Sequence, residues 1–286
     1  MSSKTNSLFI ALYLLSLTFL TSCEKDDQGA RIAQTTPACR LTKIYNPDKP
    51  TDYTIYKYDN EGKLTQAISY YEGQEDMVMN YEYNPQDQLT KHIVKNNRYW
   101  DNGRQTTKGE VTTLEYNQKG QIAKYVQLNS IPYNEISYQS KIETTCEYDL
   151  EGNRTKNLQV TSNSTTYHTS TFTSIFTYQD GNCIKAQFGQ GAPSEFITEY
   201  EYYLDMENKQ RSFSQSYYYS SLSSMTPSKN MMKKMTASFT QYPTSNYTIE
   251  NSYQYNTEGF ATTQTIVQKT QNGSATLTTI AEYECR

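Results

Sequence analysis

The sequence has 286 residues, a formal net charge of −4 and a hydrophobic fraction of only 35%. Tyrosine occurs 28 times while aliphatic residues are few, so a core must be built largely from tyrosine rings, which bury apolar area and keep a hydroxyl for polar surroundings. The mild acidity, with no basic run longer than Lys233-Lys234, excludes the electrostatic footprint of a nucleic-acid-binding protein.

The first 23 residues have the features of an export signal. After Lys4, the apolar run Leu8–Leu20 has 13 residues. This is shorter than the roughly 20 residues of a membrane-spanning helix but is typical of a signal-peptide h-region. The run ends in "LTSC", which resembles the lipobox of bacterial lipoproteins. The resemblance implies that residues 1–23 form a lipoprotein signal peptide and that Cys23 is the lipidated residue. The alternative is an ordinary signal with an incidental cysteine.

Residues 24–38, "EKDDQGARIAQTTPA", are polar and show no apolar periodicity, which predicts a flexible tether. The opening "EKDD" is similar to the acidic signal that directs Bacteroidota lipoproteins to the outer face of the outer membrane. That resemblance implies an outer membrane lipoprotein exposed at the cell surface. By its chemistry alone, the segment is a solvated charged linker.

From Cys39 onward, one phrase recurs: an aromatic residue, any residue, tyrosine, then a short Asp/Asn-x-x-Gly turn. Successive copies of the tyrosine lie 24 to 33 residues apart, except for a last step of 53 that suggests a copy without its signature. These tyrosines are Tyr58, Tyr83, Tyr116, Tyr148, Tyr178, Tyr202 and Tyr255. Asp and Asn fold back onto their own backbone and Gly supplies positive φ, so each phrase predicts a hairpin.

Apolar and polar residues alternate along these segments, which indicates β-strands with one buried face. On the returning strands, residues four apart are expected to face inward, as with Leu89 and Ile93, and this pattern places His92 in solvent. We expect an all-β fold: an antiparallel meander of about 14–16 strands, curled by its twist into a barrel-like or strongly twisted sheet. The one candidate for a short helix is Ser228–Phe239.

The recurring Tyr-Asp/Asn-x-x-Gly-x-Leu phrase resembles the YD repeat of RHS-type proteins, over most of residues 50–285. Two copies, Tyr58-Asp59 and Tyr148-Asp149, carry the YD dipeptide itself. The chain as a whole resembles Bacteroidota surface lipoproteins of unknown function that have a porin-like, barrel-like β-fold. The resemblance implies a single domain over residues 39–286. The chain shows no toxin segment, so the encapsulating role of large RHS proteins is not carried over.

Catalytic and cofactor motifs are not found in the sequence. It has two histidines, His92 and His168, and no nucleophile-elbow, zinc-protease, phosphate-loop or calcium-loop phrase. The cysteines lack metal-ligand spacing. We therefore expect neither an enzyme nor a bound cofactor or metal.

Two aromatic clusters depart from the repeat and are candidate ligand-binding sites. "NNRYWDNGR" places Tyr99 and Trp100 beside an Asn-Gly turn between strands, where an exposed indole with polar neighbours suits a sugar ring. In "SYYYSS", a strand would direct Tyr218 away from the tyrosines on either side, which leaves aromatic surface exposed. The alternatives are a tryptophan folded over the barrel end and an isolated exposed ring.

Four cysteines remain besides Cys23. Cys39 begins the first expected strand and Cys285 ends the last, so a sheet that closes on itself brings them together for a disulfide. An open sheet leaves both cysteines unpaired. Cys146 occupies a position that is aromatic in other copies, which predicts a small buried residue. The orientation of Cys183 is ambiguous, and the sequence leaves open whether it pairs with Cys146.

These observations predict a lipid-anchored cell-envelope protein that acts as a non-catalytic binding or scaffold module, for glycans or for a partner protein at the cell surface. The first alternative is a membrane-spanning β-barrel, which the low mean hydropathy and the single tryptophan disfavour. The second is a glycan-active enzyme. The oligomeric state is left open.

Overall fold

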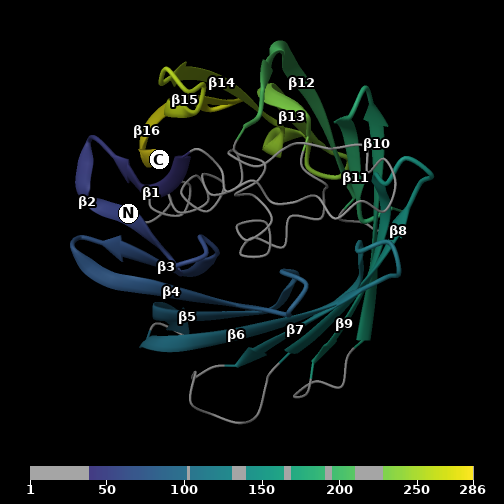
Figure 1. Cartoon of the computed structure of the whole chain (residues 1–286). Coiled ribbons are helices and arrows are strands. Elements are labelled where there is room, and N and C mark those ends of the chain that lie inside the picture. Colours follow the sequence, from purple (N-terminus) through teal and green to yellow (C-terminus); the bar gives the residue numbers. More distant parts are fainter. Residues whose placement is uncertain are drawn as a thin grey trace.

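The protein forms a closed antiparallel β-barrel, seen along its axis in the computed structural model of Figure 1. The structure describes residues 39–101, 104–130, 140–163, 169–190, 195–209 and 228–285. Within them, sixteen strands follow one another around the barrel, and β16 pairs with β1. The predicted meander and strand number are confirmed, and of the two predicted shapes it is the closed barrel that forms. The expected signal peptide and tether lie outside the described residues.

The strand bounds follow the repeat. They are β1 (Cys39–Asn46), β2 (Lys49–Tyr58), β3 (Leu64–Tyr71), β4 (Gln74–Tyr83), β5 (Leu89–Asp101), β6 (Arg104–Tyr116), β7 (Ile122–Ser130), β8 (Ser140–Tyr148), β9 (Arg154–Asn163), β10 (Thr169–Gln179), β11 (Asn182–Phe188), β12 (Phe196–Glu207), β13 (Asn230–Phe239), β14 (Tyr247–Tyr255), β15 (Ala261–Thr270) and β16 (Gly273–Cys285). A 3₁₀ helix, η1 (Pro243–Ser245), precedes β14. Residues 228–239, expected as a possible helix, instead contain β13, because the backbone there pairs with β12 on one side and with β14 on the other.

The Asp/Asn residue of each repeat closes its own turn. In the β6–β7 turn, Asn117 Oδ1 accepts hydrogen bonds from the backbone N–H groups of Lys119 and Gln121, at 2.9 and 3.0 Å. Its backbone N–H donates to Gln121 O at 2.8 Å, and Gly120 adopts a φ of 78°. The same arrangement recurs around Asp59, Asn84 and Asp149. These turns lie at one end of the barrel, which we call the repeat rim.

In most repeats, the tyrosine joins its unit to the one before it. The Tyr116 hydroxyl of β6 donates to Leu89 O, the first residue of β5, at 2.8 Å. Equivalent bonds of 2.7 to 2.9 Å run from Tyr58 to Leu41, Tyr83 to Leu64, Tyr148 to Ile122, Tyr202 to Cys183 and Tyr283 to Ala261. The recurring tyrosine therefore supplies both the core and a hydrogen bond between neighbouring hairpins.

Replacing Tyr116 by phenylalanine is expected to lower the free energy of unfolding by about 1 kcal/mol, because the ring stays packed while Leu89 O loses its donor. Chemical denaturation measures this change. Tyr242→Phe is the control, since its ring is 61% exposed, and should leave stability unaltered. An unchanged midpoint for Tyr116→Phe would show that the hydroxyl ladder does not contribute to stability.

A β-bulge follows each repeat turn and changes which residues face inward. In β5, Leu89 pairs with Tyr83 and Lys91 pairs with Glu82, so Thr90 has no partner. Its hydroxyl instead donates to Glu82 O at 3.2 Å. The extra residue reverses the alternation, so the inward residue after Leu89 is His92 rather than Ile93. His92 is fully buried, and its predicted position in solvent is wrong. The same bulge leaves Ile184 unpaired and turns Cys183 inward, where it is buried.

The buried side chains face the interior of the barrel and form one large cluster over β1–β8 and a smaller one over β10–β13, around Phe176 and Tyr200. Cys146 belongs to the first cluster and is 9% exposed, which confirms the prediction that it is a small buried residue. Neither Cys146 nor Cys183 is part of a disulfide, so these two cysteines do not pair with each other. Within the described ranges, no helix is long and apolar enough to cross a membrane.

The outer face carries lysine–glutamate pairs between neighbouring strands. On β8, Glu143 lies 2.7 Å from Lys124 of β7 and 2.9 Å from Lys141, and these lysines hold the pKa of Glu143 at about 2. Further pairs of 2.7 to 3.3 Å join β4 to β5, β8 to β9, β12 to β13 and β14 to β15. Opposite charges facing each other across strands support the observed register.

Closure of the barrel brings the two ends of the domain together. Strand β1 lies beside β16 in Figure 1, and Cys39 is in register with Cys285. The structure joins these two cysteines by a disulfide across 246 residues of sequence. The Cys39 side chain is fully buried and packs with Phe260 and Tyr283.

Candidate ligand-binding cavity at the repeat rim

Each hairpin places the first aromatic position of the repeat opposite an inward residue of the returning strand. Large residues face small or planar ones in the registered pairs Tyr56–Ala67, Tyr81–His92, Leu114–Tyr125, Phe176–Ala186 and Tyr253–Gln264. The β8–β9 hairpin departs from this pattern, because Cys146 faces Asn157. Neither side chain has the volume of an aromatic ring, so this hairpin fills its share of the interior less completely than the others.

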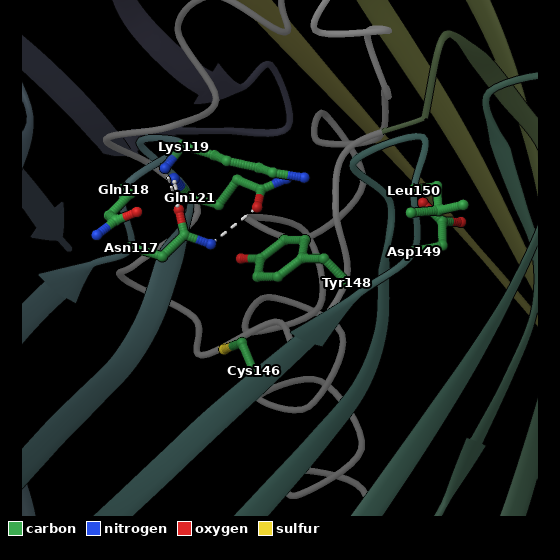
Figure 2. A pocket seen from close by; sticks show the side chains of 8 residues that line it. All are labelled: Asn117, Gln118, Lys119, Gln121, Cys146, Tyr148, Asp149 and Leu150. Carbon is green, nitrogen blue, oxygen red and sulfur yellow. Dashed lines mark hydrogen bonds between the residues drawn. The ribbon is translucent and has the colours of Figure 1, made fainter.

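A cavity of about 500 Å³ lies above Cys146, between the β6–β7 and β8–β9 turns. We call it the rim cavity. Its lining residues are Asn117, Gln118, Lys119, Gln121, Cys146, Tyr148, Asp149 and Leu150. Figure 2 shows the Tyr148 ring between the side chains of Asn117 and Gln121 and those of Asp149 and Leu150, with Cys146 below it. The volume is within the range that small-molecule sites occupy.

The cavity combines a fixed aromatic floor with unengaged polar groups. The Tyr148 hydroxyl donates to Ile122 O at 2.9 Å, and the Arg154 guanidinium carbon lies 5.7 Å from the ring centroid, so the ring is held in place. Asn117 Nδ2 donates to Gln121 Oε1 at 2.9 Å, which orients the Gln121 amide. Within the described part of the chain, the side chains of Gln118 and Lys119 have no hydrogen-bond or ion-pair partner.

The turns on either side of the cavity are packed closely together. Gly152 has a φ of 86°, and a Cβ added to it would lie 3.3 Å from Gln121 Nε2. A larger residue at this position would therefore strain the backbone and push the Gln121 amide out of place. The Asp149 carboxylate is already engaged: Oδ1 accepts from the backbone of Glu151 and Asn153, and Oδ2 accepts from Asn153 Nδ2.

The thiol in the cavity is not set up for nucleophilic attack. Burial raises the pKa of Cys146 above its usual value, which keeps the thiol protonated and weakly nucleophilic. Burial also raises the pKa of Tyr148. A metal ion could be held, among the described residues, by the group Cys39, Glu258 and Cys285, but its two thiols are joined in the disulfide. The arrangement in the rim cavity is suited to binding by hydrogen bonds and ring contact.

Two of the predicted ligand-binding residues, Tyr99 and Trp100, lie away from this cavity. Tyr99 and Trp100 belong to β5, where they pair with Thr106 and Gln105 near the opposite end of the barrel, so their predicted position in a turn between strands is wrong. The strand continues to Asp101 because β6 offers it a pairing partner. Cys23, His168 and Tyr218 lie outside the described residues.

The residues of the rim cavity were not identified from sequence, although one signal pointed to them. Cys146 replaces the tyrosine, phenylalanine or leucine that five other hairpins have at this position, and more open space beside the β8–β9 turn is the consequence of that change. This space could not be located from sequence because it depends on how two neighbouring turns pack.

Comparison with known proteins gives structural similarities alone. No protein-family model matches the chain, and no curated protein matches it. Among solved structures, it is similar to a porin-like protein from Bacteroides uniformis, with 13% identity and a TM-score of 0.39, and to one from Bacteroides vulgatus, with 11% identity and a TM-score of 0.43. Each similarity covers 85% of this chain and 98% of the other.

Proposed function

We propose that this chain is a lipid-anchored protein of the outer membrane, displayed at the cell surface, and that its barrel lies in water and serves as a non-catalytic binding module for glycans or a partner protein. The "LTSC" and "EKDD" sequences support the anchor and the display. The outer face of the barrel is the structural observation that carries the proposal.

Strand β8 shows most directly why this outer face suits water. Its nine residues extend about 30 Å, and the four positions on the outer side are Lys141, Glu143, Thr145 and Glu147. A barrel that spans the outer membrane needs an apolar band about 25 Å tall, and each lysine near the bilayer midplane costs about 2–4 kcal/mol. No stretch of that height on β8 is free of charge.

We further propose that the rim cavity is not catalytic, and the reason is the chemistry of the side chains that line it. Among the described residues of the rim cavity, the one thiol is buried and protonated, and the lining holds no histidine that could serve as its base. Nucleophilic catalysis by a thiol requires such a base within hydrogen-bonding reach.

The anchor is tested by changing Cys23 to alanine. We expect the variant to move completely from the membrane fraction to the soluble fraction and to stay monodisperse without detergent, because the proposed lipid would be its only attachment. Ser22→Ala is the control: it keeps a small residue before the cysteine and should remain with the membrane. Protease added to intact cells should digest the unaltered protein if it is displayed at the surface.

The alternative function is a barrel that spans the outer membrane, and the closed sixteen-stranded sheet is the feature that favours it. The same experiment separates the two proposals. A Cys23→Ala protein that stays in the membrane and needs detergent would support the spanning barrel and contradict the lipid-anchored one.

A further inference from the structure

We propose that the rim cavity binds a neutral saccharide, with one pyranose ring against the Tyr148 side and its hydroxyl groups toward Gln118, Lys119 and Gln121. This inference deepens the proposed role as a binding module and rests on it. The cavity is defined by the residues of the β6–β7 and β8–β9 turns given above.

The first argument is the chemistry of the two sides. Tyr148, Leu150 and Cys146 offer apolar surface on one side, while Gln118, Lys119 and Gln121 offer amide and ammonium groups on the other. A pyranose has the matching division, since its C–H faces are apolar and its edges carry hydroxyl groups that both donate and accept. A purely apolar ligand would leave the polar side without partners.

The second argument is charge. Lys119 contributes the positive charge of the lining and Asp149 the negative one, so the cavity as a whole is neutral. The Asp149 carboxylate is also held in its turn by three hydrogen bonds. This balance favours a neutral ligand over an anionic or cationic one.

The third argument is the origin of the space. Five other hairpins fill the equivalent position with tyrosine, phenylalanine or leucine. Packing alone favours a side chain that fills the interior. The small Cys146 therefore leaves open space at the rim that core packing does not explain but a ligand would.

The floor of the cavity is also rigid before any ligand binds. The hydrogen bond of Tyr148 to Ile122 O and the Arg154 guanidinium over its ring fix the aromatic surface. A fixed ring contributes to binding without the entropy cost of ordering a mobile side chain.

The test uses the protein purified from the cell envelope in detergent and a panel of the neutral sugars glucose, galactose, N-acetylglucosamine, cellobiose, lactose and diacetylchitobiose, with galacturonic acid as an anionic comparison. Saturation-transfer NMR identifies any saccharide that binds, and calorimetry measures its Kd. We expect at least one member to bind with a Kd on the order of 1 mM or tighter.

Two variants locate the site. Gln118→Ala combined with Lys119→Ala should weaken binding by about tenfold, the effect of losing roughly two hydrogen bonds. Thr257→Ala combined with Glu258→Ala alters the same two positions in the β14–β15 turn and should leave binding unchanged. Cys146→Phe restores the aromatic residue of the repeat and should abolish binding, whereas Cys146→Ser keeps the space and should retain it.

Three outcomes would overturn the inference. They are no binding by any member of the panel at concentrations on the order of 10 mM, binding that the Gln118/Lys119 double variant leaves intact, and binding of galacturonic acid in preference to every neutral sugar. If Cys146→Phe does not fold, the double variant decides alone. The membrane fractionation of Cys23→Ala is independent of these results, so the proposed function can stand if the saccharide site fails.

Discussion

Replacing Cys39 and Cys285 together by alanine is expected to lower the free energy of unfolding by about 5 kcal/mol, according to the chain-entropy model of a cross-link that closes so long a loop. The disulfide spans 246 residues and joins the first strand to the last. Without the disulfide, the conformational entropy of the unfolded chain rises over nearly the whole domain. The folded barrel, by contrast, keeps the pairing of β1 with β16. Alanine suits the buried environment of Cys39 beside Phe260.

Chemical denaturation of the variant, and of the unaltered protein with and without a reducing agent, measures this effect. Cys146→Ala is the control, because Cys146 is a free thiol and its variant should respond to the reducing agent as the unaltered protein does. Peptide mapping without reduction should yield a linked Cys39–Cys285 peptide. Free thiols at both positions in exported protein, together with an unchanged midpoint, would contradict the disulfide.

A second large effect is expected on folding stability, which should depend on pH because of the buried side chain of His92. His92 is fully buried, stacks on Tyr81 with ring centroids 4.9 Å apart, and neither ring nitrogen has a hydrogen-bond partner. Burial lowers its pKa from the usual 6.5 to about 4. Between these values the unfolded chain binds a proton that the folded protein does not, so stability falls as the pH falls from 6.5 towards 4. The loss contributed by this one group is about 3 kcal/mol.

His92→Gln should remove this dependence. Glutamine is the residue at the equivalent position of the β14–β15 hairpin, where Gln264 faces Tyr253 and is fully buried. Unfolding free energies of both proteins are measured from pH 7 to pH 4, and their difference isolates His92 from the carboxylates. Glu143 and Glu250, whose pKa values are lowered by lysine partners, lose their contribution at lower pH in both proteins. Parallel curves for the two proteins would show that His92 does not titrate in this way.

Much of the barrel could be predicted because the hydrogen bonds that close each repeat turn join residues only a few positions apart in the sequence. Asn117 closes a turn with N–H groups two and four residues away, and Gly120 supplies the positive φ. Alternation of polar and apolar residues then defines strands on either side. Such short-range chemistry can be recognised without knowing what lies beside it.

The prediction failed where a neighbouring strand sets the outcome. The bulge at Thr90 exists because the β4–β5 register leaves one residue unpaired, and it is this bulge that buries His92. Trp100 extends β5 because β6 pairs with it. Both effects depend on hydrogen bonds to another strand, which residues close in sequence do not specify by themselves.

The local sequence predicted the recurring hairpins and about 14–16 strands, because each repeat turn is stabilised by its own side chains, but it did not predict β13, which was expected as a possible helix. The tertiary fold determined that the sheet closes, since β1 and β16 meet through contacts between the two ends of the domain. It also decided that the small Cys146 leaves a cavity rather than a repacked core. The position of that cavity depends on two turns about 30 residues apart that pack together only once the barrel has formed.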